Sequence, residues 1–361
     1  MTGHSKLPPS SAARRMACPG SRSLEALYPR EETDAAREGT LAHEVCARLL
    51  RGETVLDVPE EMLEHCKLYA NHILTAAEGN ELHIEERLDI SSIHPDCWGT
   101  PDCWFKKNNT LYLYDFKYGF GYVDVYENWQ LIEYSAGVPV KNSEPFEMVI
   151  FTIIQPRWFG SGGSIRKWEV TRDTIQDYWF QLEIAERLAM TEPAATTPSD
   201  QCVNCKARHA CPALEQTVLS HIDSSSYNVP YDLTDRQIGQ ELRIMHRAAK
   251  LLDARITGLE EEALNLLKRG HSIPHYQVGH TQPRERWKSD DATIIALGDV
   301  LGLDVAKPQE PITPKQAVAK AIKEKKDKKI IEILKDNSET PPGSIKLVEI
   351  NEKENRKIFA K

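Results

Sequence analysis

"DCWFKKNNTLYLYDFKYG", residues 102–119, contains two runs of strand-forming residues joined by Asn108 and Asn109. Asparagine tolerates the backbone conformations of a tight hairpin turn, so we expect antiparallel strands over residues 102–107 and 110–117. Side chains alternate along a strand, which places leucines on one face of the second strand and aromatic residues on the other. The acid and base that close this strand, Asp115 and Lys117, share the face of the leucines.

The hairpin predicts that two carboxylates approach each other. A symmetric turn places Asp102 opposite Asp115, with Cβ atoms about 4.5 to 5.5 Å apart, where like charges destabilise a sheet. A hard divalent cation bound by carboxylate oxygens would offset that repulsion. Lys117 adds a positive donor beside the ion, and this combination suits phosphodiester hydrolysis. An isolated D-x-K would instead be read as a surface ion pair at a hairpin end, and the surrounding segments decide between the two interpretations.

The rest of the chain predicts an α/β core with helices on both sides of the strands. Further strands are expected over residues 81–90 and 146–156, and helices over 41–50, 60–77 and 235–269, where apolar residues recur at helical spacing. A loop rich in turn formers follows residue 191. We therefore divide the chain into a domain over residues 1–219 and a smaller, mostly helical domain over residues 220–361.

The composition is that of an ordinary globular protein. The 361 residues are 40% hydrophobic and carry a net charge of −9, which argues weakly against a nucleic-acid partner. Basic residues nevertheless outnumber acidic ones by 14 to 9 over residues 307–361. This range includes an expected Lys-rich helix that ends near Lys335 and contains Lys320, Lys323, Lys326 and Lys329. A surface that follows a DNA backbone and a solvated face are equal interpretations of it. No run of about 20 apolar residues could span a bilayer, and no secretory signal is evident, so we expect a cytoplasmic protein.

Four segments, taken in order, resemble the RecB/AddB-type branch of the PD-(D/E)XK nuclease superfamily. They are "GTLAHEV" (residues 39–45), "GTPD" (99–102), where Gly99 is expected to form a turn, "DFK" (115–117) and "QLIEY" (130–134). The resemblance covers residues 10–215. It implies a restriction-endonuclease-like core, with a central mixed sheet flanked by helices, and Mg²⁺ or Mn²⁺ at the site.

The same resemblance assigns roles to particular residues. The metal ligands would be His43, Asp102 and Asp115, and the catalytic residues Asp102, Asp115 and Lys117. Glu85 falls where many relatives hold a catalytic acid, although a solvated strand charge is an equal reading. The residues that touch DNA would be Gln130, Tyr134 and Tyr118.

A cysteine run predicts a second metal centre. Cys202, Cys205 and Cys211 are close in sequence, and zinc and iron–sulfur sites both usually take four ligands, for which Cys18 is the fourth candidate. Members of the same nuclease branch hold a [4Fe-4S] cluster with one cysteine before the core and three after it, and this chain resembles them. A structural Zn²⁺, with His209 as a substitute ligand, is the alternative. The remaining cysteines are read as buried core thiols; they are Cys46, Cys66, Cys97 and Cys103.

These observations predict a metal-dependent DNA exonuclease that acts at DNA ends. The resemblance to phage or prophage proteins favours a role in phage DNA replication or recombination in the host cytoplasm, with linear DNA ends or single strands as substrates. A phage single-strand-binding or recombination protein is the expected partner. A catalytically inactive DNA-end or single-strand binding protein on the same scaffold is the alternative, and a cysteine-based redox sensor is a third reading.

Overall fold

The hairpin forms in the register that its turn predicts. In the computed structural model, β4 (Cys103–Lys107) and β5 (Thr110–Phe116) pair antiparallel with Trp104 opposite Leu113. The two asparagines of the turn adopt φ values of 49° and 55°, the left-handed conformation that a two-residue hairpin turn needs. The structure describes residues 5–29, 33–141, 146–224, 233–279, 328–329 and 332.

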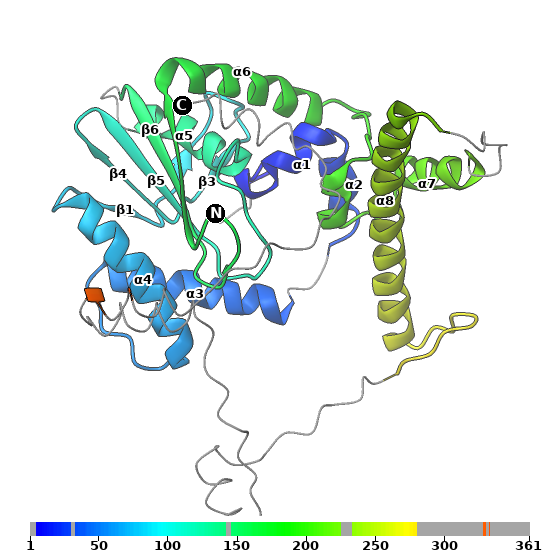
Figure 1. Ribbon diagram of the computed structural model, residues 1–361, viewed down its shortest axis with the longest axis horizontal. Coiled ribbons are helices and arrows are strands. Elements are labelled where there is room, and N and C mark those ends of the chain that lie inside the picture. Colours follow the sequence, from blue (N-terminus) through cyan, green and yellow to red (C-terminus); the bar gives the residue numbers. More distant parts are fainter. Residues whose placement is uncertain are drawn as a thin grey trace, which may run out of the picture. The chain divides into compact units, whose positions relative to one another are not determined.

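This hairpin is the centre of a five-stranded mixed sheet in the order β1-β4-β5-β6-β7 (Figure 1). The other three strands are β1 (His83–Ile84), β6 (Met148–Ile154) and β7 (Ile165–Thr171). β5 pairs with β6 in parallel, and the other neighbours pair antiparallel. The parallel pair places the carboxyl ends of β5 and β6 at the same edge of the sheet.

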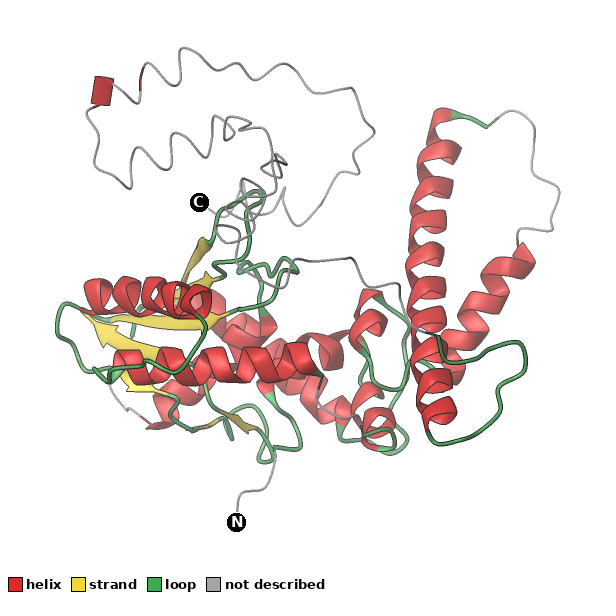
Figure 2. Ribbon diagram, turned by 90° about the horizontal axis from the view of Figure 1, so that it is seen from below, coloured by secondary structure: helices red, strands yellow, loops and turns green. Residues whose placement is uncertain are grey.

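Helices cover both faces of the sheet (Figures 1 and 2). On one face α3 (Asp34–Leu50) and α4 (Glu60–Ala77) bury Tyr114 and Phe116 of β5 in one apolar core. On the other face α5 (Trp129–Lys141) and α6 (Arg172–Ala189) belong to a second core, which contains the leucines of β5. The predicted α/β class, with a mixed sheet flanked by helices, is confirmed.

The predicted single strand over residues 81–90 is wrong. Glu85 has φ 49°, outside the β region, and this residue separates β1 from β2 (Leu88–Asp89). β2 leaves the main sheet and pairs with β3 (Trp98–Gly99) in a small second sheet. Alternating polarity predicts an extended segment but carries no signal for a break in its middle.

A buried charge cluster joins the N-terminal segment to α5 and α6. Arg15 of α1 (Ala12–Ala17) donates to both carboxylate oxygens of Glu186, at 2.8 and 2.6 Å, and to those of Glu133, at 3.3 and 3.2 Å. These three side chains are at most 2% exposed. The remaining short helices and the C-terminal helices are η1 (Pro9–Ser11), α2 (Ser21–Ala26), η2 (Asp200–Asn204), α7 (Pro212–Ser224) and α8 (Asp235–Lys268).

The chain divides into two units, Met1–Val278 and Gly279–Lys361. Apart from residues 279, 328–329 and 332, the second unit lies outside the described residues, and so does most of the predicted Lys-rich helix. The proposed division at residue 219 therefore stays a prediction. Within the described ranges, none of the helices is both long and apolar enough to cross a bilayer.

Candidate active site and cysteine pocket

The acid and base at the end of β5 form a buried ion pair. The Lys117 ammonium lies 3.0 Å from each carboxylate oxygen of Asp115, whose side chain is 3% exposed. Burial raises the pKa of Asp115, and the lysine charge opposes that rise. Burial alone would lower the pKa of Lys117, but the charges of Asp115 and Asp102 raise it above its usual value. Lys117 therefore keeps its positive charge beside the carboxylate.

Asp102, one residue before β4, ties the hairpin to helix α3. Its Oδ2 accepts the backbone N–H of Phe116 at 2.6 Å, and its Oδ1 lies 3.0 Å from Nδ1 of His43. The charge of Asp102 also raises the pKa of Asp115. The two aspartates thus interact at the end of the hairpin, beyond the last paired residues of the ladder.

His43 and Glu85 complete a group of three metal-binding side chains with Asp102. One ligand atom from each residue lies within 4.8 Å of the others. Burial would lower the pKa of His43, but the carboxylate of Asp102 raises it to about 9. Burial and the nearby Asp102 charge raise the pKa of Glu85 to about 7. Glu85 lies where the strand is interrupted, with φ 49°. Its backbone N–H donates to the carbonyl of Asp102 at 3.1 Å, which holds Glu85 beside this group.

This donor set fits a hard divalent cation. Two carboxylates and one imidazole are ligands of the kind that Mg²⁺ and Mn²⁺ accept. Asp115 adds a buried oxygen: among the described residues its Oδ2 accepts no hydrogen bond, although it lies 3.0 Å from the lysine nitrogen. Because the pKa of Glu85 is raised, its carboxyl group tends to keep a proton, and a bound cation would displace that proton.

Helix α5 closes the site from the other face of the sheet. Gln130 accepts a hydrogen bond from the Lys117 ammonium at 3.1 Å. Tyr134, one turn further on, is buried and packs against Gly99 of β3. A Cβ at Gly99 would lie 2.7 Å from the Tyr134 ring and 2.8 Å from that of Pro9. Gly99 was expected to form a turn; it lies instead in a strand, where only a hydrogen fits between two rings.

Tyr118 lies at the margin of this group. Its hydroxyl accepts a hydrogen bond from Arg157 at 2.9 Å, and the guanidinium carbon stands 3.8 Å from its ring centroid. The Tyr118 ring is 5% exposed. The predicted contact of Tyr118 with DNA stays a prediction, and Arg157 is the side chain that covers it.

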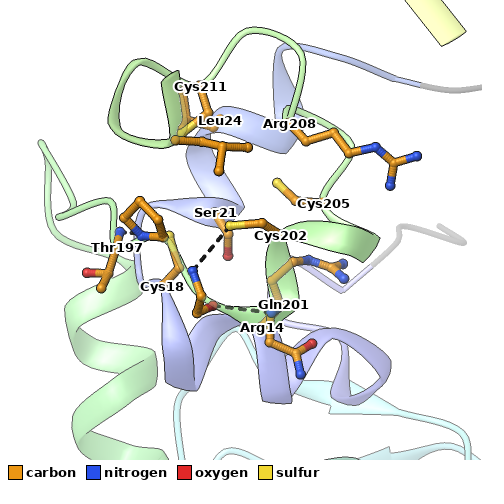
Figure 3. Close-up of a pocket in the computed structure, with 13 residues that line it drawn as sticks. Arg14, Cys18, Ser21, Leu24, Thr197, Gln201, Cys202, Cys205, Arg208 and Cys211 are labelled. Atoms are coloured by element: carbon orange, nitrogen blue, oxygen red, sulfur yellow. Dashed lines mark hydrogen bonds between the residues drawn. The ribbon is translucent and has the colours of Figure 1, made fainter. Parts of the chain in front are cut away.

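The four predicted cluster cysteines line one pocket, although they come from distant parts of the chain (Figure 3). Cys18 directly follows α1, and the other three lie in the segment that runs through η2 to the start of α7. Thr197 donates its backbone N–H to the sulfur of Cys18 at 3.2 Å, and Ser199 donates to Cys202 at 3.3 Å. N–H donors aimed at sulfur are a feature of metal–thiolate sites.

His209, the alternative zinc ligand, packs edge-on against Tyr28 at 4.6 Å between ring centroids. The pocket therefore presents four thiol sulfurs, a number that both a zinc ion and an iron–sulfur cluster take.

A family model matches residues 4–355, and its description is "Protein of unknown function (DUF2800)". The chain belongs to the DUF2800 family. The chain is also similar to solved structures of LHK-Exo, an alkaline exonuclease from Laribacter hongkongensis. The complex of that protein with dAMP is 13% identical over 50% of this chain and 91% of the other, with a TM-score of 0.25. A second structure is 12% identical over 52% and 88%, with a TM-score of 0.23. At this identity and TM-score, the likeness makes no statement about activity.

The DUF2800 chain brings the predicted active-site residues to one edge of its sheet and the predicted cysteines to one pocket. Tyr118, in contrast, contacts Arg157, a residue that the sequence analysis did not predict to be near the site. Sequence reasoning also missed the Arg15–Glu133–Glu186 cluster. Glu133 lies within the helix segment "QLIEY", and only the packing of α1 on α5 and α6 shows it as buried.

Proposed function

We propose that this protein is a divalent-metal-dependent deoxyribonuclease of the PD-(D/E)XK type that acts at DNA ends. One observation carries the proposal: the ion pair of Asp115 and Lys117 lies at the same sheet edge as the three converging ligand atoms of His43, Glu85 and Asp102. Structural ion pairs do not need two further carboxylates and an imidazole beside them. A site for phosphodiester hydrolysis needs both a cation and a positive donor near the attacking water.

The side chains divide the work of hydrolysis. A bound divalent cation would stabilise charge on the phosphate and lower the pKa of a bound water. His43, Glu85 and Asp102 would hold the ion, and Asp115 adds its buried oxygen. Lys117, fixed by Asp115 and Gln130, would orient the water whose oxygen forms the new bond to phosphorus as the P–O bond to the leaving strand breaks.

The test compares linear and closed circular DNA incubated with the protein and Mg²⁺, Mn²⁺ or EDTA. We expect linear DNA to be degraded with either ion, circular DNA to be spared, and EDTA to abolish the reaction. Lys117→Ala should lower the rate at least about a hundredfold, because it removes the positive donor. Lys67→Ala, an exposed lysine on α4, is the matched control and should cleave normally.

Three outcomes would contradict parts of the proposal. Cleavage of circular DNA at the same rate as linear DNA would replace end-directed action with internal cleavage. Cleavage by Lys117→Ala at the wild-type rate would show that this site does not carry out the reaction. Binding of DNA ends without cleavage under every ion would replace the enzyme with a DNA-end binding protein.

We propose further that Cys18, Cys202, Cys205 and Cys211 hold a [4Fe-4S] cluster. The support is their shared pocket, the N–H···S bonds to Cys18 and Cys202, and the resemblance to nucleases that hold such a cluster. Protein purified without oxygen should be brown and hold about four irons per chain. Cys205→Ser should lose the iron, whereas Cys66→Ala, a buried thiol on α4, should keep it. Zinc at one per chain would overturn the assignment.

We propose the biological setting on the resemblance to phage and prophage nucleases alone. DNA ends processed by this activity would serve phage replication or recombination in the host cytoplasm. The expected protein partner is a phage single-strand-binding or recombination protein. Co-purification of tagged protein from infected cells, with and without nuclease treatment, would show whether such a partner binds directly.

A further inference from the structure

Two loops leave the active-site edge of the sheet together, because β5 and β6 run parallel (Figure 1). The first, residues 117–128, follows Lys117, and the second, residues 155–164, follows β6. These loops carry three strongly exposed aromatic side chains: Phe120 at 67%, Tyr122 at 44% and Phe159 at 79%. The two loops contact each other, because Trp158 packs on Tyr122 and Arg157 lies over Phe120. We call these three exposed rings the aromatic platform.

Buried hydrogen bonds hold the backbone of the first loop. Gln155 donates its side-chain amide to the carbonyls of Gly119 and Gly121, at 2.8 and 2.6 Å. Arg166, 6% exposed, donates to the carbonyl of Val123 at 3.1 and 2.9 Å and to the side chain of Gln155 at 2.6 Å. Buried polar groups with satisfied hydrogen bonds fix the backbone of this loop, so the exposure of Phe120 and Tyr122 does not result from loose packing.

Two of the rings contact an arginine. The Arg157 guanidinium carbon lies 4.9 Å from the centroid of Phe120, and that of Arg166 lies 4.9 Å from the centroid of Tyr122. Glu38 and Glu61 pair with Arg157 and hold it in place. Tyr122 also contacts the ring of Trp158, with centroids 5.0 Å apart. The exposed fractions of Phe120 and Tyr122 nevertheless leave ring surface accessible to a flat partner.

We propose that the aromatic platform stacks the bases of single-stranded DNA beside the hydrolytic site. This inference rests on the proposed function, since it supplies the strand on which that site would act. Aromatic rings next to a phosphate-processing site are the common means of holding single strands without reading sequence, because every base has a π face. In a duplex the bases stack on each other, so the platform selects strands that are already unpaired or frayed at an end.

The test measures binding in EDTA, so that cleavage cannot contribute. The probes are fluorescein-labelled oligothymidine and a blunt hairpin duplex, followed by anisotropy. Wild type should bind the single strand more tightly than the duplex. Phe159→Ala and Phe120→Ala should each weaken single-strand binding roughly tenfold, and Phe159→Trp should restore it. Phe180→Ala, an aromatic residue on α6 that is 61% exposed, is the matched control and should bind like wild type.

The outcomes separate this inference from the nuclease proposal. Ring variants that bind oligothymidine like wild type would overturn the platform, and normal cleavage by them would leave hydrolysis standing. Loss of affinity in the ring variants, together with a wild type that cleaves nothing, would support the platform and overturn hydrolysis. Equal binding of the duplex and the single strand by wild type would also overturn the platform.

Discussion

At the scale of single residues, the contact of His43 with Asp102 controls a measurable titration. Burial would lower the pKa of His43, but the carboxylate of Asp102 and, to a smaller extent, that of Asp115 raise it to about 9. Asp102→Asn removes the larger of the two charges and leaves the burial, so we expect the pKa of His43 to fall well below 9. NMR titration of metal-free protein in EDTA would follow the imidazole. Asp89→Asn, at an exposed aspartate of β2, should leave this titration unchanged.

The contact of His43 with Asp102 also determines in which direction the stability of the protein changes with pH. A histidine whose folded pKa is raised stabilises the protein below its unfolded pKa, and that contribution is lost as pH rises through the folded value. We therefore expect metal-free wild type to lose stability, relative to Asp102→Asn, between about pH 6.5 and 9. Urea unfolding at both limits measures the difference, and parallel curves for the two proteins would refute the pairing.

The raised pKa of Glu85 leads us to expect that metal binding releases protons. Its pKa is raised to about 7 by burial and by the charge of Asp102, and a cation would bind the ionised form. Mn²⁺ affinity should therefore increase from about pH 6 through about 7 as Glu85 ionises, and further up to about pH 9 as His43 loses its proton. Calorimetry in buffers of different ionisation enthalpy measures the proton release. Glu85→Gln should bind more weakly and release fewer protons. Proton release identical to wild type in this variant would show that Glu85 is not a ligand.

At the scale of elements, Gly99 sets how closely β3 and α5 approach. A methyl group there would meet the rings of Tyr134 and Pro9 below 3.0 Å. Gly99→Ala should destabilise the protein by about 1–3 kcal/mol, the usual cost of forcing extra volume into a packed core. Urea unfolding measures this change, and the variant should also cleave more slowly if Tyr134 is displaced.

The matched control for Gly99 lies within helix α3. A Cβ at Gly39 would meet no atom within 4 Å, and alanine favours a helix over glycine. Gly39→Ala should therefore stabilise the protein by about 0.5–1 kcal/mol. A Gly99→Ala protein as stable as wild type would show that the rings move aside without cost.

How much of these elements the sequence predicts depends on how local their causes are. The asparagine turn fixes the hairpin register, and helical spacing fixes α4 at its observed ends, because neighbouring residues decide both. The break at Glu85 depends on a carbonyl 17 positions later, that of Asp102, and leaves no mark in the alternating pattern. Gly99 was recognised as a necessary glycine for the wrong reason, since a ring from α5 excludes a side chain there.

At the scale of the whole molecule, α8 packs on the cysteine segment. A Cβ at Gly258 would lie 2.5 Å from the Arg208 side chain and 2.9 Å from the backbone nitrogen of His209. We expect Gly258→Ala to push the helix away and to speed the loss of iron in air, followed by the decay of visible absorption. Gly239→Ala, on the same helix with nothing within 4 Å, should decay like wild type. Equal decay of the visible absorption in the two variants would show that the packing of α8 does not protect the proposed cluster.

Arg15 links the segment that carries Cys18 to helix α5. It lies three positions before Cys18 and grips Glu133, which stands on α5 between Gln130 and Tyr134. If Cys18 holds the proposed cluster, loss of iron frees this end of the chain, and the buried guanidinium transmits that change to α5, whose Gln130 accepts a hydrogen bond from Lys117. The proposed nuclease would then lose activity under iron limitation with every residue of its hydrolytic site unchanged.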